Sequence, residues 1–322
     1  MDNISHTLVG AALGEAGLKR RTGLGMAVLM IAANLPDLDV LAIPLGQNLT
    51  FRRGWTHGPV GLLVLPVLLT LCTVAWDRWQ TRRGSRPPDR LPVLPKQLLL
   101  LSYVGALSHP FLDWLNTYGI RLLMPFSHEW FYGDALFIVD PWIWTALGIG
   151  IFLARRRQRL GRPHARRPAR IALGAVVLYI TLMVTGSGTA SVVAEREVAA
   201  REGAAPERLM AGPVPLNPLR RQIVYDRGDA YGFGILAWTP RPEVTLEAEL
   251  LPKRLEHPAV REAMREPVIR DFLYWSRFPF FHVTDDADGL VVFVNDARFS
   301  REPAEGWAGR SIRVAREASD DP

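Results

Sequence analysis

The chain has 322 residues, of which 48% are hydrophobic and 22% are charged, and its mean hydropathy of +0.07 is high for a soluble protein. Residues 1–195 contain apolar runs approaching the roughly 20 residues that cross a bilayer, whereas residues 196–322 resemble ordinary soluble sequence. The net charge of +6 does not predict a nucleic-acid partner, because the basic residues cluster in short loops between apolar runs, and the single Cys72 excludes a disulfide.

In chain order, the sequence predicts a short N-terminal helix and then five membrane spans. Residues 4–18 have helical character but are too short to cross a bilayer. The five spans are predicted at residues 22–43, 57–76, 94–115, 135–154 and 170–192. The first of them should be irregular, because Pro36 and two aspartates interrupt it. Such a break is tolerated where it lines a polar cavity or is buried in protein.

The distribution of positive charge predicts the orientation. Arginine and lysine concentrate in the connections at 19–21, 78–96 and 155–170. The opposite connections hold only Arg52, Arg53 and Arg121. The arginine-rich side is therefore expected to be cytoplasmic, and the domain after the fifth span extracytoplasmic. We expect a multi-pass protein of the inner membrane in contact with membrane lipids.

With that orientation, acidic and imidazole side chains from distant segments fall on one side of the membrane. They are His6, Asp37, Asp39, His57, His109, Asp113 and Asp140. Ionisable groups at membrane depth are costly unless they are paired, bound to metal or exposed to water. Imidazoles mixed with carboxylates suit a divalent cation. The pattern predicts a metal site at the outer membrane face.

The individual ligand candidates each have a structural alternative. His109 and Asp113 are four residues apart and share one helix face, yet the histidine could instead bond a backbone carbonyl and the aspartate could end the helix. Asp37 and Asp39 could bind one ion or bridge two, or they could cap a helix. His57 follows a Gly-Trp-Thr turn and could instead be an interfacial histidine. His6 is equally open.

Four further residues are candidates for chemistry or substrate binding. His128, in an aromatic-rich outer loop, is a candidate outer ligand or acid/base group. Asp140 either caps a helix or supports a ligand histidine. Arg52 and Arg53 are basic on the outer side and predict binding of a phosphate or another anionic head group; the alternative is anchoring to anionic lipids.

The C-terminal part predicts a small soluble α+β domain after a polar connector at 195–212. Arg221–Trp238 and Phe281–Arg298, the second turning at Asp285–Gly289, are predicted hairpins. Val244–Leu251 is a predicted strand and His257–Arg277 a predicted helix. The domain contains no catalytic constellation, and we expect it to have a binding or regulatory role.

Four ordered motifs carry a resemblance that covers roughly residues 1–145. They are Ser5-His6-Thr7, Pro36-Asp37-Leu38-Asp39, Arg53-Gly54-Trp55-Thr56-His57, and Ser108-His109 through Asp113 with the following Asn116-Thr117-Tyr118-Gly119. They resemble the YdjM-like inner-membrane metal-dependent hydrolases. That family is distantly similar to zinc-dependent phospholipase C, which implies a phosphoester substrate. The chain departs from shorter members at Val40, where a histidine can stand, and in its added C-terminal domain.

These observations combine into one functional hypothesis. We expect a mainly α, polytopic helical bundle (1–195) followed by an extracytoplasmic α+β domain (196–322). The bundle would be a metal-dependent hydrolase of a phosphoester such as a phospholipid, holding one or two zinc ions. The expected ligands are His6, Asp37, Asp39, His57, His109 and Asp113, with Asp37, His128 and Asp140 as catalytic candidates. The alternative is a non-enzymatic membrane protein with a structural metal site and a sensing outer domain.

Overall fold

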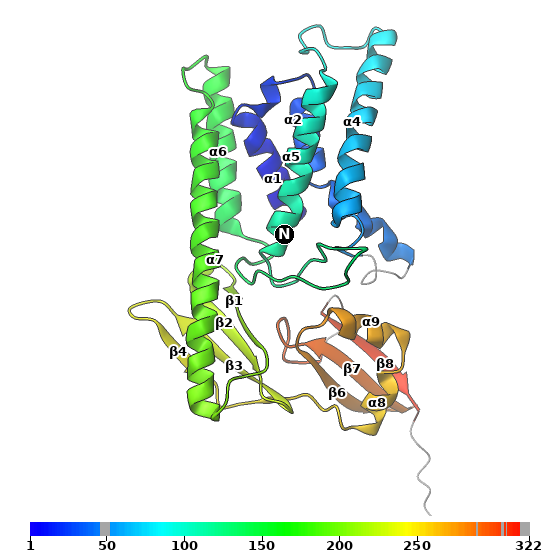
Figure 1. Ribbon diagram of the computed structural model, residues 1–322, viewed down its shortest axis with the longest axis vertical. Coiled ribbons are helices and arrows are strands. Elements are labelled where there is room, and N and C mark those ends of the chain that lie inside the picture. Colours follow the sequence, from blue (N-terminus) through cyan, green and yellow to red (C-terminus); the bar gives the residue numbers. More distant parts are fainter. Residues whose placement is uncertain (46–51, 288, 304–305, 307, 316–322) are drawn as a thin grey trace, which may run out of the picture. The chain divides into compact units, whose positions relative to one another are not determined.

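The computed structural model describes residues 1–45, 52–287, 289–303, 306 and 308–315, and the chain forms two compact units, Met1–Gly186 and Ser187–Pro322. The first unit is helical (Figure 1). Its elements are α1 (Asn3–Glu15), η1 (Leu18–Arg20), α2 (Gly25–Ala32), η2 (Leu35–Leu45), α4 (Pro59–Arg82), α5 (Pro95–Trp114), α6 (Pro141–Arg159) and the beginning of α7 (Arg167–Glu202). The predicted N-terminal helix is confirmed.

Local sequence explains where these helices begin. Pro59, Pro95 and Pro141 each lie in the first turn of their helix, where the missing amide hydrogen costs nothing and the fixed φ favours helix. Asp2 caps α1 by accepting hydrogen bonds from the amides of Ile4 and Ser5. These signals determine the residue at which each of these helices begins.

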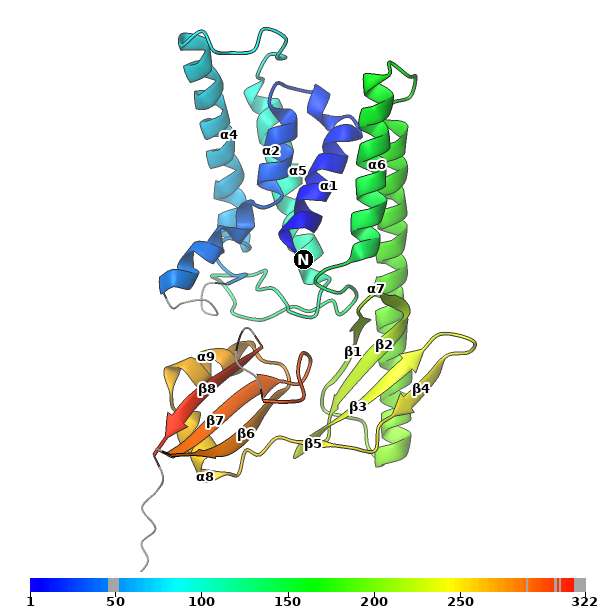
Figure 2. The same ribbon diagram turned by 180° about the vertical axis from the view of Figure 1, so that it is seen from behind.

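The helices of the first unit alternate in direction, so its connections gather at two ends. Figures 1 and 2 show the connections at 16–24, 83–94 and 160–166 together at one end, with the N-terminus and the 115–140 loop at the other. At the basic end, Lys19 Nζ lies 3.0 Å from Gln158 Oε1. At the other end, His57 Nε2 lies 3.1 Å from His109 Nε2. The polar residues and the basic loops thus occupy opposite ends of this unit.

Small residues let the helices approach closely. A Cβ on Gly10 of α1 would lie 2.6 Å from the carbonyl oxygen of Leu29 in α2. A Cβ on Gly105 of α5 would lie 2.7 Å from Cβ of Ala32. Any larger side chain would push these backbones apart, as expected for helix contacts built on small residues. Close packing of α1, α2 and α5 brings the ends of all three helices together.

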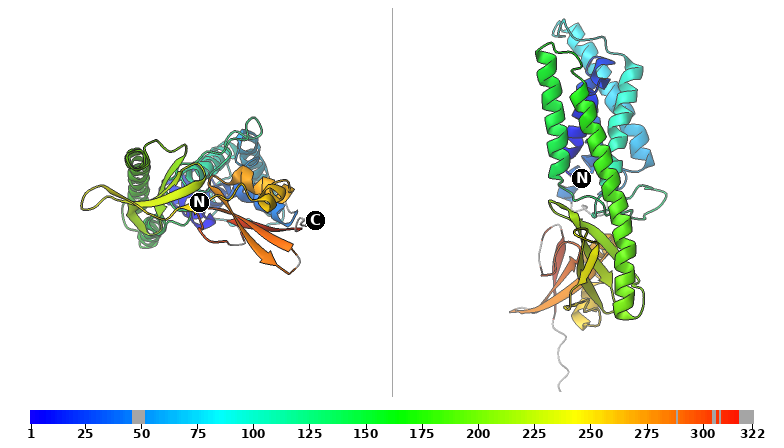
Figure 3. Two further views of the ribbon diagram at one scale, coloured as in Figure 1. Left: turned by 90° about the horizontal axis from the view of Figure 1, so that it is seen from below. Right: turned by 90° about the vertical axis from the view of Figure 1, so that its left-hand side faces the viewer.

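The helices α6 and α7 form an antiparallel pair, visible in the right panel of Figure 3. Gly150 of α6 faces Ala172 of α7 so closely that a Cβ on the glycine would lie 2.4 Å from that of the alanine. Ile143, Leu147 and Ile151 of α6 belong to one core cluster with Ala172, Val176 and Ile180 of α7. The pair is a packed hairpin and not two isolated helices.

Two helices in the described part of the chain are long and apolar enough to cross a membrane, not the five that were predicted. They are α4, with mean hydropathy 2.1, and α7, with 1.9. The predicted span at 22–43 is divided, because α2 ends at Ala32 and η2 follows. α5 carries Lys96 and Asp113, and α6 ends in consecutive arginines, so polar residues dilute the hydropathy of both.

In the second unit, the end of α7 packs on an antiparallel sheet. Ala190, Ala194 and Val198, spaced four residues apart, form a core with Ile223 and Leu236. The strands are β1 (Leu209–Val214), β2 (Asn217–Asp226), β3 (Ala230–Ala237) and β4 (Glu243–Leu246) in that order, with β5 (Leu251–Pro252) also pairing with β3. The first predicted hairpin is therefore confirmed.

A second sheet completes the α+β unit. It contains β6 (Pro279–Asp286), β7 (Gly289–Asp296) and β8 (Gly309–Val314), in that order, and the helices α8 (Pro258–Ala263) and α9 (Pro267–Trp275) precede it. Asp286 pairs with Gly289, which confirms the second hairpin, although position 288 of its turn lies outside the described residues. Met210 and Phe233 of the first sheet share a core with Phe278 and Phe280.

Three details of the C-terminal prediction were wrong. The connector at 195–212 is not a connector, because α7 continues to Glu202 and β1 begins at Leu209. The buried alanines of α7 explain the longer helix, since they give it an apolar face against the sheet. The helix at 257–277 is divided at Pro267, and the strand at 244–251 is two short strands.

Candidate metal centre

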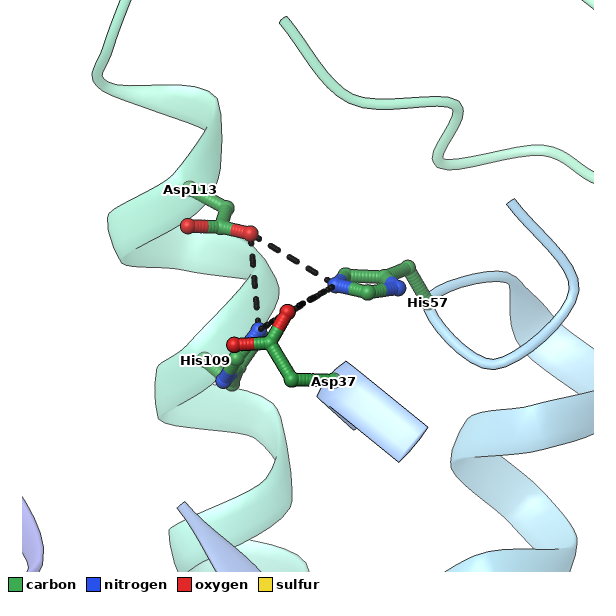
Figure 4. Close-up of side chains that lie close together, drawn as sticks. All are labelled: Asp37, His57, His109 and Asp113. Carbon is green, nitrogen blue, oxygen red and sulfur yellow. Dashed lines mark hydrogen bonds and ion pairs between the residues drawn. The ribbon is translucent and has the colours of Figure 1, made fainter. Parts of the chain in front are cut away.

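Four buried side chains from three segments meet at one end of the helical unit. Asp37 comes from η2, His57 from the turn before α4, and His109 and Asp113 from one face of α5 (Figure 4). One ligand atom from each residue lies within 4.8 Å of the other three. We call these four residues the metal cluster, because their donor atoms could hold a metal ion.

The separations between donor atoms suit a tetrahedral cation. His57 Nε2 lies 3.1 Å from His109 Nε2, and Asp113 Oδ2 lies 3.5 and 3.4 Å from these two nitrogens. Bonds of about 2.0–2.1 Å at tetrahedral angles would separate ligand atoms by roughly 3.3–3.4 Å. Asp37 Oδ1 is farther, at 3.8 Å from His57 Nε2 and 3.7 Å from His109 Nε2. It is the most loosely placed of the four donors.

Hydrogen bonds on the far side of each ring turn the Nε2 atoms toward the cluster. His109 Nδ1 lies 2.7 Å from the carbonyl oxygen of Ala33, so this nitrogen donates and Nε2 keeps its lone pair. His57 Nδ1 lies 3.1 Å from Thr56 Oγ1, its hydrogen-bond partner, and 3.5 Å from Asp39 Oδ2. With the Nε2 of His109 unprotonated, the 3.1 Å between the two Nε2 atoms is bridged either by a proton on His57 Nε2 or by a cation bound to both nitrogens. The arrangement is compatible with a bound cation.

Unsatisfied carboxylate oxygens support the same conclusion. Asp37 Oδ1 and Asp113 Oδ2 are buried and have no hydrogen-bond partner among the described residues. A buried acceptor without a donor costs about 1–3 kcal/mol, and more when it is charged. Both atoms are the ones that lie nearest to the two Nε2 nitrogens. A cation in the metal cluster would satisfy them together, so the residues present fit a metal ion.

Asp39 lies beside the metal cluster and not within it. Its Oδ2 accepts a hydrogen bond of 2.6 Å from the backbone amide of Arg53 and faces Nδ1 of His57, the nitrogen turned away from the cluster. A carboxylate in this position fixes the tautomer of a ligand histidine and raises its basicity. Direct ligation by Asp39 remains a prediction.

His6 also lies beside the metal cluster. Its ring stacks on that of His109 with centroids 3.7 Å apart, and its Nε2 is 3.3 Å from Asp113 Oδ1. The amino group of Met1 and Nη2 of Arg53 contact the same oxygen. Positive or donor groups thus gather on one oxygen of Asp113 while the other faces the cluster. A direct bond from His6 to a metal remains a prediction.

The two arginines have different surroundings. The Arg53 side chain is buried, donates to Asn116 Oδ1 at 3.2 Å and to the carbonyl oxygen of Gly119 at 3.1 Å, and lies over the Tyr118 ring. Burial lowers the pKa of Arg53 to about 10, which leaves the guanidinium charged at neutral pH. The Arg52 side chain is 25% exposed, with Nη1 3.8 Å from Asp39 Oδ1. Only Arg52 is open to an incoming anion.

The remaining predicted residues lie apart from the metal cluster. Asp140 caps α6, accepting from the amides of Trp142 and Ile143 at 3.0 and 3.2 Å and from Tyr179 Oη at 3.0 Å. These contacts match the capping alternative. His128 is exposed in the loop at 115–140. Catalytic roles for both residues remain predictions.

Asn116 and Tyr118, which were not predicted from the sequence as site residues, hold Arg53 against Asp113. Asn116 is fully buried, and its Oδ1 also accepts from the Tyr118 amide at 2.8 Å. Gly119 follows with φ 88°, a conformation that favours glycine. The sequence signal that could have identified these residues is the position of Asn116-Thr117-Tyr118-Gly119 immediately after the helix that carries Asp113.

Comparison with known proteins is consistent with the geometry. No curated protein and no solved structure matched the chain. A family model described as YdjM inner membrane protein matches residues 1–190. The matched residues include every member of the metal cluster, all of α4 and the part of α7 up to residue 190. Because the match extends over more than half of the chain, the protein belongs to the YdjM inner membrane protein family.

Proposed function

We propose that this protein is a membrane-bound metal-dependent hydrolase of a phosphoester such as a phospholipid. The observation that supports it is the convergence of two imidazole nitrogens and two carboxylate oxygens, two of them unsatisfied, in one buried cluster. The donor types favour zinc. A bound zinc ion lowers the pKa of water and polarises a phosphoryl oxygen.

Three residues of the metal cluster would bind the ion, and the fourth would take part in the reaction. His57, His109 and Asp113 have the separations of tetrahedral ligands and would hold the ion. Asp37 has the longest separations, and its side chain is 8% exposed whereas those of the other three are 0% exposed. Asp37 is thus the group best placed to meet substrate, and it would accept the proton of the attacking water.

Arg52 supports an anionic substrate. Its guanidinium is partly exposed and lies beside Asp39, next to the cluster. A guanidinium binds phosphate oxygens through paired hydrogen bonds. Arg53, in contrast, is committed to Asp113, Asn116 and Gly119, so it would act by holding the Asp113 carboxylate in place.

The placement of charge supports an outer-face site. The basic connections lie at the opposite end of the helical unit from the metal cluster, and the basic end is expected in the cytoplasm. The cluster would then face the extracytoplasmic side in a multi-pass bundle. α7 starts at the basic end, so the domain that follows it would also be extracytoplasmic.

One observation favours the alternative of a structural metal site. The four donors would complete a tetrahedral shell, and structural zinc sites have closed shells whereas catalytic ones keep a position for water. In this alternative the ion would only join η2, the turn before α4 and α5, and the C-terminal domain would bind a partner.

Metal analysis together with a phosphoester panel separates the two functions. Purified wild-type protein should contain stoichiometric metal, and His109→Ala should remove it, while His164→Ala, in the basic connection, should retain it. Asp37→Asn should keep most of the metal and lose hydrolysis. If Asp37→Asn and wild type both bind metal and neither hydrolyses any phosphoester class, the structural alternative holds. Metal-free, fully folded wild-type protein would refute both.

A further inference from the structure

A groove of about 650 Å³ runs along α6 beside α1. Its lining residues are Leu8, Gly148, Ile151, Phe152, Arg155, Arg156, Arg159 and Leu160. The α6 residues recur every three or four positions, so they form one stripe on one face of the helix. At 1.5 Å per residue, the stripe is about 18 Å long. It is apolar toward the middle of the helix and basic at its end.

The apolar part of the groove is open to a long, flexible ligand. A Cβ on Gly148 would meet no atom within 4 Å, so the glycine leaves free space. Ile151 is 8% exposed and belongs to the core, whereas the Phe152 ring is 63% exposed along the groove. A hydrocarbon chain in this space would cover apolar surface that the described residues leave exposed.

The basic end carries charge that the protein does not neutralise. Arg155 is paired with Glu15, its Nε lying 3.0 Å from Glu15 Oε1. Glu15 also pairs with Lys19 at 2.6 Å. Arg156 and Arg159 are exposed and contact no carboxylate in the described part of the chain. Two free guanidinium groups thus lie where the apolar groove ends.

We propose that this groove binds an anionic phospholipid, with an acyl chain along Gly148 and Phe152 and the phosphate on Arg156 and Arg159. The charge favours an anionic head group over a zwitterionic one, and the apolar lining favours a lipid over free phosphate. Basic pockets between helices on the cytoplasmic side are suited to such lipids. The basic end of the groove lies beside Glu15, at the other end of α1 from His6, so phosphate binding there is independent of hydrolysis at the metal cluster.

The charge contribution can be tested by native mass spectrometry of the full-length protein with phosphatidylglycerol and phosphatidylcholine. Each arginine near an anionic head group contributes about fivefold in affinity, so Arg156→Gln with Arg159→Gln should weaken phosphatidylglycerol binding by roughly 25-fold. Phosphatidylcholine binding should hardly change. Arg78→Gln with Arg82→Gln, which removes the same charge from α4, should leave phosphatidylglycerol bound. Equal losses in the two double variants would overturn the proposal.

The groove itself can be tested without changing charge. Gly148→Leu should fill the free space and weaken phosphatidylglycerol binding, and leucine favours the helix more than glycine does. Gly174→Leu on α7 is the matched control, because a Cβ there also meets no atom within 4 Å and the residue does not line the groove. Unchanged binding in Gly148→Leu, or displacement of the lipid by inorganic phosphate alone, would show that no lipid groove exists.

Discussion

Asp296 in the C-terminal unit and the carboxylates of the metal cluster in the helical unit are all buried, but their oxygens have opposite surroundings. In the C-terminal unit, Asp296 accepts from Arg298 Nε and Nη2 at 2.9 and 2.8 Å and from Ser276 Oγ at 2.6 Å. In the metal cluster, Asp37 Oδ1 and Asp113 Oδ2 have no donor among the described residues. Full satisfaction is the sign of a structural role, whereas buried acceptors that converge without donors indicate a place for a ligand.

The largest expected effect on stability is at Asp296, the buried carboxylate whose hydrogen bonds are satisfied. Arg298→Ala should leave Asp296 buried without its charged partner and destabilise the C-terminal unit by about 3–5 kcal/mol. Amide hydrogen exchange of β6 and β7 in increasing denaturant measures this effect on the C-terminal unit. Metal content should stay at the wild-type value. If metal is lost as well, the two regions do not have the separate roles inferred from their hydrogen bonds.

A smaller effect is expected beside the metal cluster. Asp39→Asn should weaken metal binding by about 10- to 100-fold, because the neutral amide is a poorer partner for Nδ1 of His57. Competition with a chelator of known affinity measures the change. Asp77→Asn, in the basic half of α4, is a control that should bind metal normally. A complete loss of metal in Asp39→Asn would instead indicate that Asp39 is a direct ligand.

Asp140 extends the comparison, because it is a buried carboxylate that has hydrogen-bond donors within the same helical unit as the unsatisfied ones. Asp140→Ala removes the cap of α6 and should cost about 1 kcal/mol in the stability of the helical unit. Metal affinity should remain unchanged. Hydrolysis that disappears in a folded, metal-loaded Asp140→Ala protein would support the catalytic role predicted from the sequence and contradict a purely capping one.

The smallest effect is the response of the satisfied region to acid. Burial alone would raise the pKa of Asp296, but Arg298 and the hydrogen bonds to the carboxylate lower it below the ordinary value. A carboxyl whose pKa is depressed on folding stabilises the fold above its unfolded pKa of about 3.9 and loses that contribution as pH falls through the folded value. The C-terminal unit should therefore keep its stability between pH 7 and 5 and lose it only below about pH 4. A pH titration of unfolding that shows loss already above pH 5 would contradict this reading.

The sequence predicted which segments of the chain form the site better than it predicted which of their side chains belong to the metal cluster. Apolar runs and the placement of arginine were enough to bring Asp37, His57 and His109 to one end, since helix direction alternates along the chain. Which oxygen faces the cluster depends on backbone detail. The 3-10 geometry after Pro36 turns Asp37 toward the imidazoles and Asp39 toward the back of His57, and no sequence rule specifies that choice.

Close helix packing explains other differences between the predicted and the observed structure. The contact of Gly105 with Ala32 brings α5 against α2, which lets His109 reach the carbonyl oxygen of Ala33. Hydropathy patterns do not encode such contacts. The same limit applies to α7, which was predicted to end with its apolar run near residue 192. It continues because Ala194 and Val198 pack on a sheet formed by later residues.

X-ray absorption spectroscopy of the purified protein tests the central claim most directly. We expect one tightly bound divalent metal, with two imidazole nitrogens and carboxylate oxygens at about 2.0–2.2 Å and no sulfur. The imidazole scattering should decrease in His57→Ala if metal remains bound. A folded wild-type protein that binds no metal, or a metal whose shell lacks imidazole, would show that the metal cluster is not a metal site.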